Sequence, residues 1–308
     1  MKVLDGPLAA WEAQEAPSAL SIGVFDGVHL GHRAILDRLS ASPYPSTVLT
    51  FDPHPAEVLS PGTDPRLITT IDERVDLLEG AGVDTVGVLD LAEIRHLEPD
   101  QFVAQVLVDK VGVRLVVVGP DFQFGKDRAG DCDTLRRAGA RHHFDVEVVD
   151  LAESSGVISS SRIRRLIEEG DVATAANLLG SRYRLSEVVV SGDRRGTAMG
   201  FPTANLGPPP RKVVPGRGVY AAFAHLGGAM LAAAVNVGVR PTFGGTDLVI
   251  EAYILDFDRD IYGSELELEF VDRLRPELEF ESVERLVEAM NQDVARVRQV
   301  LKTAAVGT

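Results

Sequence analysis

Two different hydrophobic periodicities divide this chain. Up to about residue 180, short apolar and β-branched runs alternate with stretches whose apolar residues recur every three to four positions. We expect strands at 18–25, 46–51, 85–89, 115–118 and 146–149, and helices at 30–39, 72–79, 99–111 and 160–168. Such alternation predicts parallel strands joined by right-handed crossovers, and therefore a Rossmann-like layered α/β domain.

From Tyr183 onward the pattern changes to successive strands with turn residues between them. These predicted strands lie at 185–191, 219–226, 230–237, 248–255 and 265–271, which is typical of an antiparallel β-barrel or sandwich. Residues 282–301 then predict an amphipathic helix. Its apolar stripe consists of Val283, Leu286, Val287, Met290, Val294, Val297 and Leu301. The stripe could bind a partner, but we expect it to pack on the barrel. We place the boundary near residues 181–184, between domains of residues 1–182 and 183–308.

Composition and charge narrow the class of protein. The 308 residues exceed one usual domain, and 45% hydrophobic with 25% charged residues is ordinary for a packed globular protein. The formal net charge of −15 disfavours nucleic acid or an anionic membrane as partner, although the basic run at 162–165 can still attract phosphorylated substrates. One cysteine, no signal-peptide pattern and no long apolar run together predict a cytoplasmic protein.

A glycine- and histidine-rich string follows the first predicted strand. In residues 23–32, Gly23, Gly27 and Gly31 would let a nucleotide approach the backbone, and His29 and His32 are three positions apart. If both histidines lie in the first helical turn, they point to the same side and, with the free N–H groups there, could hold triphosphate oxygens. The pair could instead bind a metal, but no third His or Cys stands nearby in sequence.

A second phosphate-binding element is predicted at residues 158–164. Ser160 and Ser161 would cap a helix whose first turn carries Arg164, so that hydroxyls, backbone donors and a guanidinium could share one anion. Alone, this string would be only an ordinary capped helix. Two other glycine-containing strings are decoys: residues 119–126 lack the Walker A spacing, and residues 80–82 follow a helix and fit a helix stop.

The second domain carries its own candidate chemistry. In the string at 200–205, Pro202 restricts the backbone just before Thr203 and Asn205, whose side-chain oxygens suit a hard cation. The preceding string at 191–196 is a flexible basic turn that could cover phosphates. Glu251 lies in an apolar strand pattern, where alternation would place it on one face with Val249 and Tyr253. A salt-bridged or solvent-facing glutamate is the alternative explanation.

Several strings in this order resemble one enzyme family. The histidine string, Phe51-Asp52-Pro53-His54-Pro55, the 119–125 loop and the serine–arginine helix resemble the adenylyltransferase half of the prokaryotic bifunctional riboflavin kinase/FAD synthetases. The 200–205 string, the string at 236–243, Glu251 and the residues at 256–257 and 262–263 resemble its kinase half. The resemblance implies that riboflavin and ATP give FMN, and that FMN and ATP give FAD and pyrophosphate.

The same resemblance implies roles for individual residues. Glu251 would be the general base for the riboflavin 5′-hydroxyl, while the adenylyl transfer needs no base because the FMN phosphate is already a nucleophile. The remaining predicted catalytic residues are His29, His32 and Arg164. Thr203 and Asn205 would bind Mg²⁺ with ATP as co-substrate. Nucleotide-binding candidates are Gly23, Phe25, Asp26, Gly31, Asp121, Phe122, Gly125, Ser160, Ser161, Gly192, Arg195, Gly200, Pro202, Thr203 and Asn205.

Departures from the family pattern and rival functions remain open at this point. Gln123, Thr197 and Tyr253 each replace a residue that is common in the family. One domain could be an inactive remnant, or the chain could be a flavin-binding regulator without turnover. A class I aminoacyl-tRNA synthetase shares the histidine string, but the acidic chain and the absence of a Lys-Met-Ser-Lys-like loop disfavour it. The expected partners are riboflavin, FMN, FAD and ATP, with no nucleic acid and no membrane.

Overall fold

The computed structural model describes residues 1–14, 16–60, 62–63, 65–149, 158–192, 200–207, 209–242 and 245–306. These residues form two compact units, Met1–Ser160 and Ser161–Thr308, and we describe each unit by itself. The compact units divide at residue 160, whereas the boundary between functional modules is predicted near residues 181–184. Compactness measures packing and not activity, so the boundary between modules stays a prediction.

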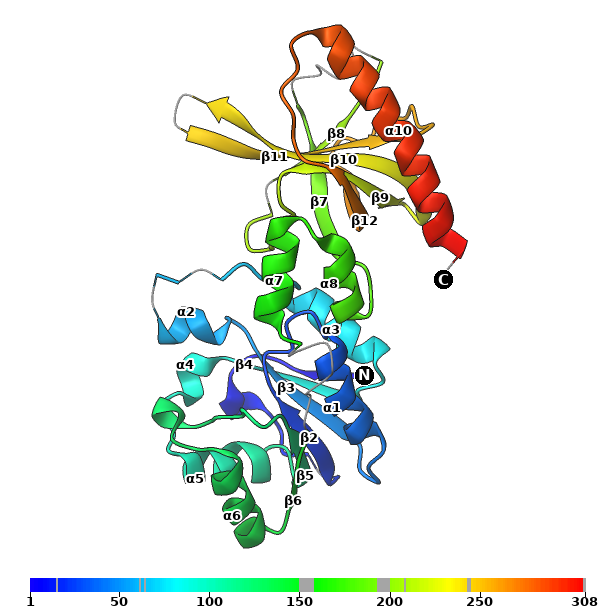
Figure 1. Cartoon of the computed structure of the whole chain (residues 1–308). Helices are drawn as coiled ribbons and strands as arrows, with labels where there is room; N and C mark the ends of the chain where they lie inside the picture. Colours follow the sequence, from blue (N-terminus) through cyan, green and yellow to red (C-terminus); the bar gives the residue numbers. More distant parts are fainter. Residues whose placement is uncertain are drawn as a thin grey trace. The chain divides into compact units, whose positions relative to one another are not determined.

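The first unit is built on a six-stranded parallel sheet (Figure 1). The strands are β1 (Lys2–Leu4), β2 (Ser18–Ile22), β3 (Ser46–Phe51), β4 (Thr85–Leu89), β5 (Val113–Val118) and β6 (Asp145–Val148). They lie in the order β1-β4-β3-β2-β5-β6, and every neighbouring pair is parallel. The prediction of a Rossmann-like domain is therefore confirmed.

Helices cover both faces of this sheet because successive strand residues point to opposite sides. Ala19 packs with α1 (Leu30–Ser40) and α3 (Ile71–Gly80), whereas Leu20 packs with the opposite layer. That layer consists of α5 (Pro99–Phe102), the π-helical turn η2 (Val103–Val108) and α6 (Cys132–His142). The shorter helices are η1 (Leu8–Ala10), α2 (Pro55–Leu59), α4 (Leu91–Ile94) and η3 (Lys126–Arg128).

Local sequence signals account for several element boundaries. Thr70 and Glu73 form a capping box at the start of α3, and the Asp131 carboxylate accepts a hydrogen bond from the Thr134 N–H at the start of α6. The first predicted strand was expected to reach residue 25, but β2 ends at Ile22. A strand cannot extend to residue 25, because Phe25 has a φ of 54°, which is not extended backbone.

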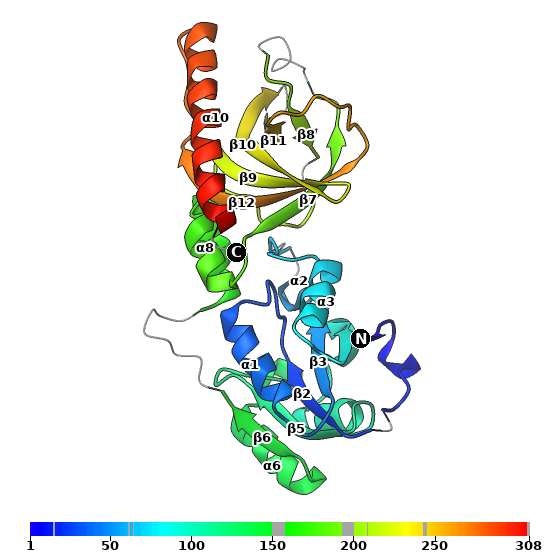
Figure 2. The ribbon, with the colours of Figure 1, turned by 90° about the vertical axis from the view of Figure 1, so that its right-hand side faces the viewer.

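The second unit contains the helices α7 (Ser160–Glu169) and α8 (Val172–Leu179) and a closed antiparallel barrel (Figure 2). The first residue of α7, Ser160, belongs to the first unit. The barrel strands are β7 (Arg184–Val190), β8 (Ala204–Leu206), β9 (Gly218–Leu226), β10 (Ala229–Thr242), β11 (Gly245–Ile254) and β12 (Glu265–Arg275). They close in the order β10-β11-β8-β7-β12-β9. The predicted barrel is confirmed, and β8 is a strand that the sequence pattern did not predict.

The terminal helix α10 (Val283–Val306) packs along β9, β10 and β12 (Figure 2). Val297 and Leu301 are buried against Phe223 and Leu274, which confirms the expected packing for this part of the stripe. At the other end of the helix, Val283 is 59% exposed, so the stripe does not pack along its whole length. Among the described residues, no helix combines the length and the apolar character that crossing a bilayer requires.

Candidate active sites

The histidine string follows β2, the strand at which the strand order of the first sheet reverses. From β2 the chain moves outward to β3 and β4, and it then returns to the other side of β2 to form β5. The loops after β2 and β5 therefore leave the carboxyl ends of neighbouring strands, where open α/β sheets bind their ligands. The strings at 23–32 and 119–125 are these two loops, so the fold brings them to one edge.

The loop after β2 has an unusual backbone that the protein holds from within. Phe25, Gly27 and Val28 have φ values of 54°, 83° and 39°, and a β-branched residue such as Val28 adopts positive φ only under constraint. The Asp26 carboxylate, 1% exposed, accepts hydrogen bonds from the N–H groups of Ile68 (3.0 Å) and Thr69 (2.9 Å). Asp26, a nucleotide-binding candidate, thus directs its carboxylate into the protein, where it holds the loop.

This loop ends in a stacked pair of histidines. His29 is the N-cap of α1, and its Nδ1 accepts a hydrogen bond from the His32 backbone N–H at 3.2 Å. The two rings stack with centroids 3.6 Å apart and planes 12° apart, and the Phe25 ring lies 4.8 Å from that of His32. The structure therefore brings together the two side chains that the sequence singled out.

Burial decides the charge of this pair. Desolvation lowers the pKa of His29 to about 4 and holds the pKa of His32 well below its usual value, with the positive charge of Arg74 adding to the effect on His32. Both rings are consequently neutral at pH 7. Because Nδ1 of His29 is an acceptor, its proton lies on Nε2. The pair can donate hydrogen bonds to phosphate oxygens, but it brings no positive charge of its own.

Ser160, the last residue of the first unit, contacts the same loop. The Ser160 hydroxyl donates a hydrogen bond to the backbone carbonyl of Asp26 at 2.9 Å, a contact within the first unit. Ser161 and Arg164 follow on α7 within the second unit. There Ser161 is exposed, Arg164 is partly buried, and an Arg164 Nη lies 3.4 Å from the Ser161 hydroxyl. Hydroxyls and a guanidinium near a helix start are suited to bind phosphate.

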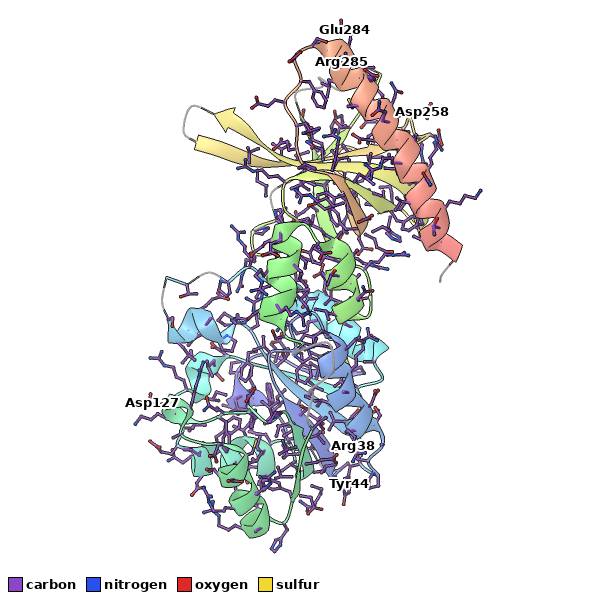
Figure 3. The ribbon with its side chains drawn as sticks, viewed as in Figure 1. Arg38, Tyr44, Asp127, Asp258, Glu284 and Arg285 are labelled. Atoms are coloured by element: carbon purple, nitrogen blue, oxygen red, sulfur yellow. The ribbon has the colours of Figure 1, made fainter. Side chains whose placement is uncertain are left out.

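The loop after β5 is a hairpin stabilised by aromatic stacking. The Phe122 and Phe124 rings stack at 5.5 Å, and Phe124 and Gly130 exchange two backbone hydrogen bonds of 3.0 and 2.9 Å. Gly125 has a φ of 74°, and a Cβ there would lie 2.9 Å from Pro99. Asp121 is exposed, as is Asp127 at the tip of the hairpin (Figure 3). Gly125 is therefore required by its positive φ and by its close approach to Pro99.

In the barrel, Glu251 lies in a row of polar residues that crosses three strands. It is paired with Asn205 on β8 and with Asn236 on β10. Directly opposed residues of antiparallel strands carry their side chains on the same face, with Cβ atoms about 5 Å apart. Val249, Glu251 and Tyr253 line one pocket, which confirms the shared face that alternation predicted.

That pocket has a volume of about 430 Å³, within the range of about 300–1,000 Å³ that is common for small-molecule sites. Thr203, Asn236 and Glu251 make one part of its wall polar, and the charged residues Arg275, Glu277 and Asp293 also line it. The rest is largely apolar and comes from the barrel, the segment after β12 and α10: Phe201, Val219, Ala234, Val239, Val249, Tyr253, Leu278, Phe280, Leu286, Met290 and Val294. The sequence pattern assigned the whole α10 stripe to packing on the barrel and did not predict that Leu286, Met290 and Val294 line a pocket.

Gly192 leaves the space that the side chain of Asn205 occupies in this polar row. A Cβ on Gly192 would lie 2.4–2.5 Å from the amide carbon, nitrogen and oxygen of Asn205, so the position tolerates no side chain without a shift. Asn205 is 8% exposed, and its amide donates to the Thr203 carbonyl at 3.4 Å. Gly200 has a φ of 84°, and Pro202 is exposed. The candidate Arg195 and the family departure at residue 197 lie outside the described residues.

Comparison with known proteins assigns both halves of the chain. Residues 11–162 match the FAD synthetase family, and residues 179–301 match the riboflavin kinase family. The bifunctional riboflavin kinase/FMN adenylyltransferase of Pseudomonas fluorescens is 38% identical over 92% of this chain and 93% of its own length. The Escherichia coli K12 enzyme of the same name is 34% identical over 97% of both chains. The chain belongs to the bifunctional riboflavin kinase/FMN adenylyltransferase family.

A solved structure is similar to this chain over nearly its full length. A crystal structure from Streptococcus pneumoniae, described as a macrolide-efflux protein, superposes with a TM-score of 0.90. It is 29% identical in sequence, and the match covers 97% of this chain and 99% of that one. The likeness shows a common fold, while the two family matches and the full-length relatives provide the functional assignment.

The kinase half offers oxygen donors that suit a magnesium ion. Among the described residues, no group of three or more His, Cys, Asp and Glu side chains could hold a metal ion. Thr203 lines the pocket, and Asn205 on β8 is paired with Glu251 on β11. A hydroxyl and an amide carbonyl are hard oxygen donors of the kind that fits Mg²⁺. A magnesium ion there would need the nucleotide phosphates to complete its coordination, which fits a metal that arrives with ATP.

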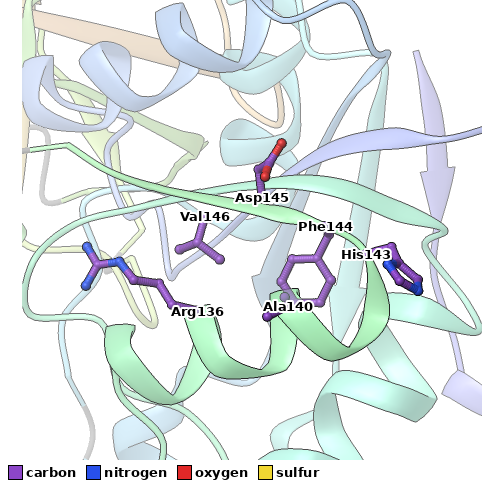
Figure 4. A pocket seen from close by; sticks show the side chains of 7 residues that line it. Arg136, Ala140, His143, Phe144, Asp145 and Val146 are labelled. Carbon is purple, nitrogen blue, oxygen red and sulfur yellow. The ribbon is translucent and has the colours of Figure 1, made fainter.

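A second hollow, in the adenylyltransferase half, lies away from the loops that follow β2 and β5. It has a volume of about 470 Å³ and is lined by residues at the end of α6 and the start of β6, with Arg136 and His143 on either side of Phe144 (Figure 4). Because β6 begins there, the hollow lies at the amino ends of the strands. The histidine loop lies at the carboxyl ends, so this hollow is at the opposite edge of the sheet.

Proposed function

We propose that this chain makes FAD with two separate sets of residues, one in each half. As a member of its family it is a riboflavin kinase and FMN adenylyltransferase: it phosphorylates riboflavin with ATP and then adenylylates FMN. The observation that supports the kinase assignment most directly is the position of Glu251. Its carboxylate lies in a pocket whose remaining wall is largely apolar, between Asn205 and Asn236.

In the kinase step, riboflavin lies in the barrel pocket with its ring system against the apolar wall. Glu251 accepts the proton of the 5′-hydroxyl as that oxygen attacks the γ-phosphorus of ATP. The bond from the γ-phosphorus to the β–γ bridging oxygen breaks, and ADP leaves. Thr203 and Asn205 orient the phosphates, and a magnesium ion bound there would neutralise part of their charge. A base is needed because an alcohol is a poor nucleophile at neutral pH.

In the adenylyl transfer, an oxygen of the FMN phosphate attacks the α-phosphorus of a second ATP. The bond from the α-phosphorus to the α–β bridging oxygen breaks, and pyrophosphate leaves. His29 and His32 donate hydrogen bonds to the phosphates as neutral rings, and Ser160, Ser161 and Arg164 hold the β- and γ-phosphates. The residues position two polyanions and need not remove a proton.

Two variants of the full-length chain, one in each half, test the two proposed sets of residues. Glu251→Gln should abolish FMN formation from riboflavin and leave conversion of supplied FMN to FAD unchanged, as measured by chromatography of the products. His29→Ala combined with His32→Ala should show the opposite pattern, with accumulation of FMN. Glu265→Gln, which removes an exposed carboxylate of the same barrel, is the matched control. Normal kinase activity in E251Q would exclude Glu251 as the base.

A further inference from the structure

The helix α10 changes its environment at Asp293. On the C-terminal side, Val297 and Leu301 are buried in the core that the helix shares with the barrel. On the N-terminal side, Leu286 and Met290 are only partly buried and line the pocket that contains Glu251. Asp293 itself is 5% exposed and also lines the pocket. It therefore stands between the packed half of the helix and the half that forms a pocket wall.

Asp293 forms a bidentate ion pair with Arg275, the last residue of β12. Arg275 Nε donates to both carboxylate oxygens at 3.1 Å, and an Nη donates to Oδ2 at 2.8 Å. The side chains are 17% and 8% exposed. A buried, two-pronged pair is strict about geometry, because a small displacement leaves poorly solvated charges apart. The pair thus fixes the distance between the end of β12 and α10.

Arg275 also holds the segment that follows it, residues 276–280. Its other Nη donates to the Pro276 carbonyl at 3.1 Å, and its guanidinium lies over the Phe280 ring, 5.6 Å from the centroid. Leu278 and Phe280 from this segment line the pocket. One side chain therefore connects two pocket walls, the helix and the segment, to the barrel strand that supports them.

We propose that Arg275 and Asp293 are positioning residues for riboflavin, whose ion pair sets the opening of the pocket between the barrel, α10 and the 276–280 segment. The inference rests on the proposed function, because it takes this pocket as the flavin site. The isoalloxazine ring is rigid and planar, so it cannot adapt to walls that shift. Walls held in place before binding spare the cost of ordering them when the flavin enters.

The test measures kinetic constants for riboflavin and ATP separately in the full-length enzyme. Arg275→Lys keeps the charge but loses the fork and the ring contact, and Asp293→Asn keeps the shape but loses the charge. We expect each variant to raise KM for riboflavin about tenfold. This corresponds to the binding free energy that is lost when one or two side chains must be ordered on binding. The kcat, the KM for ATP and the adenylylation of supplied FMN should stay within about twofold of the unmodified enzyme.

The same helix offers a matched control. Arg298 on α10 forms an exposed ion pair with Asp256 at 2.7 Å, with side chains 53% and 72% exposed. Arg298→Lys makes the same chemical change on the same element, and we expect it to leave KM for riboflavin unchanged. If R275K and D293N behave like R298K, the proposal is wrong. A fall in kcat together with similar rises in both KM values would also overturn it, because such a pattern would indicate a general structural role.

Two further variants separate this inference from the proposed function. Met290→Trp should fill the pocket and prevent riboflavin binding, which is read directly from riboflavin fluorescence. If M290W binds and phosphorylates riboflavin normally, the pocket is not the flavin site, and the placement of riboflavin in the proposed function is wrong. If M290W is blocked while R275K and D293N are normal, only the role of the pair fails. Should a single substitution unfold the barrel, the combination R275M/D293L removes both charges at similar volume, and the same rise in KM is expected. An unchanged KM there would again overturn the proposal.

Discussion

Acid should destabilise the first unit because it contains a buried histidine that resists protonation. His29 is 4% exposed, and burial lowers its pKa to about 4 from an ordinary value of 6.5. The unfolded chain takes up a proton on this ring below pH 6.5, whereas the folded chain does so only near pH 4. The stabilisation is therefore fully present above pH 6.5 and is lost as the pH falls toward 4.

The size of the effect follows from the difference in pKa. One pKa unit corresponds to about 1.4 kcal/mol, so a difference of about 2.5 units amounts to roughly 3.4 kcal/mol once both states are protonated. At pH 4.5 about 2.5 kcal/mol of this is already lost. His32 acts in the same direction because burial also lowers its pKa. Such a loss is a large fraction of the stability of an ordinary domain.

The chain provides a specific probe for the measurement. Trp11 is the only tryptophan in the sequence, and it is buried in the core of the unit that contains His29. Urea unfolding followed by tryptophan fluorescence at pH 7.5 and 4.5 thus reports on that unit. The variant His29→Gln removes the titrating ring, and His96→Gln, at an exposed position, controls for the loss of one imidazole. Comparing variants at each pH cancels the other ionisable groups.

We expect the unmodified chain and H96Q to lose about 2.5 kcal/mol more than H29Q between pH 7.5 and pH 4.5. If H29Q loses as much stability as the unmodified chain over this interval, His29 is not held neutral by burial. The assignment of the histidine pair as neutral hydrogen-bond donors would then be wrong. Adenylylation would in that case have to be reinterpreted with a charged imidazolium facing the phosphates.

Three further substitutions test how backbone and buried groups shape the two sites. Gly192→Ala should push Asn205 out of the polar row and lower kinase turnover at least about tenfold, with FAD formation from supplied FMN unchanged; equal turnover in a riboflavin kinase assay would contradict it. Asp26→Asn should weaken the hold on the histidine loop and cost about 1–3 kcal/mol by Trp11 fluorescence, while kinase activity persists. Gly125→Ala should impair adenylylation alone, because a Cβ there would collide with Pro99; a normal KM for FMN and a normal kcat would argue against it.

Much of the fold could be predicted from local periodicity. The predicted bounds of β3 and β4 coincide with those observed, α1 is one residue longer than predicted at its C-terminal end, and α3 is one residue longer at each end. Such elements follow from a short repeat of apolar positions, since each must bury one face or both. The three-residue strand β8 could not be found this way, because its hydrogen-bond partners in β7 and β11 are distant in sequence. Helix α6 was also missed, since it is rich in arginine and buries few residues.

The candidate site shows the same division between sequence and tertiary structure. The sequence by itself determined the spacing of His29 and His32, the polar strings and the alternation around Glu251, because those properties depend only on neighbouring residues. Only the tertiary structure decided that Glu251 aligns with Asn205 and Asn236, that burial keeps the histidines neutral, and that α10 forms a pocket wall. Register between strands, desolvation and the shape of a cavity all depend on residues far apart in the chain, and no local pattern contains them.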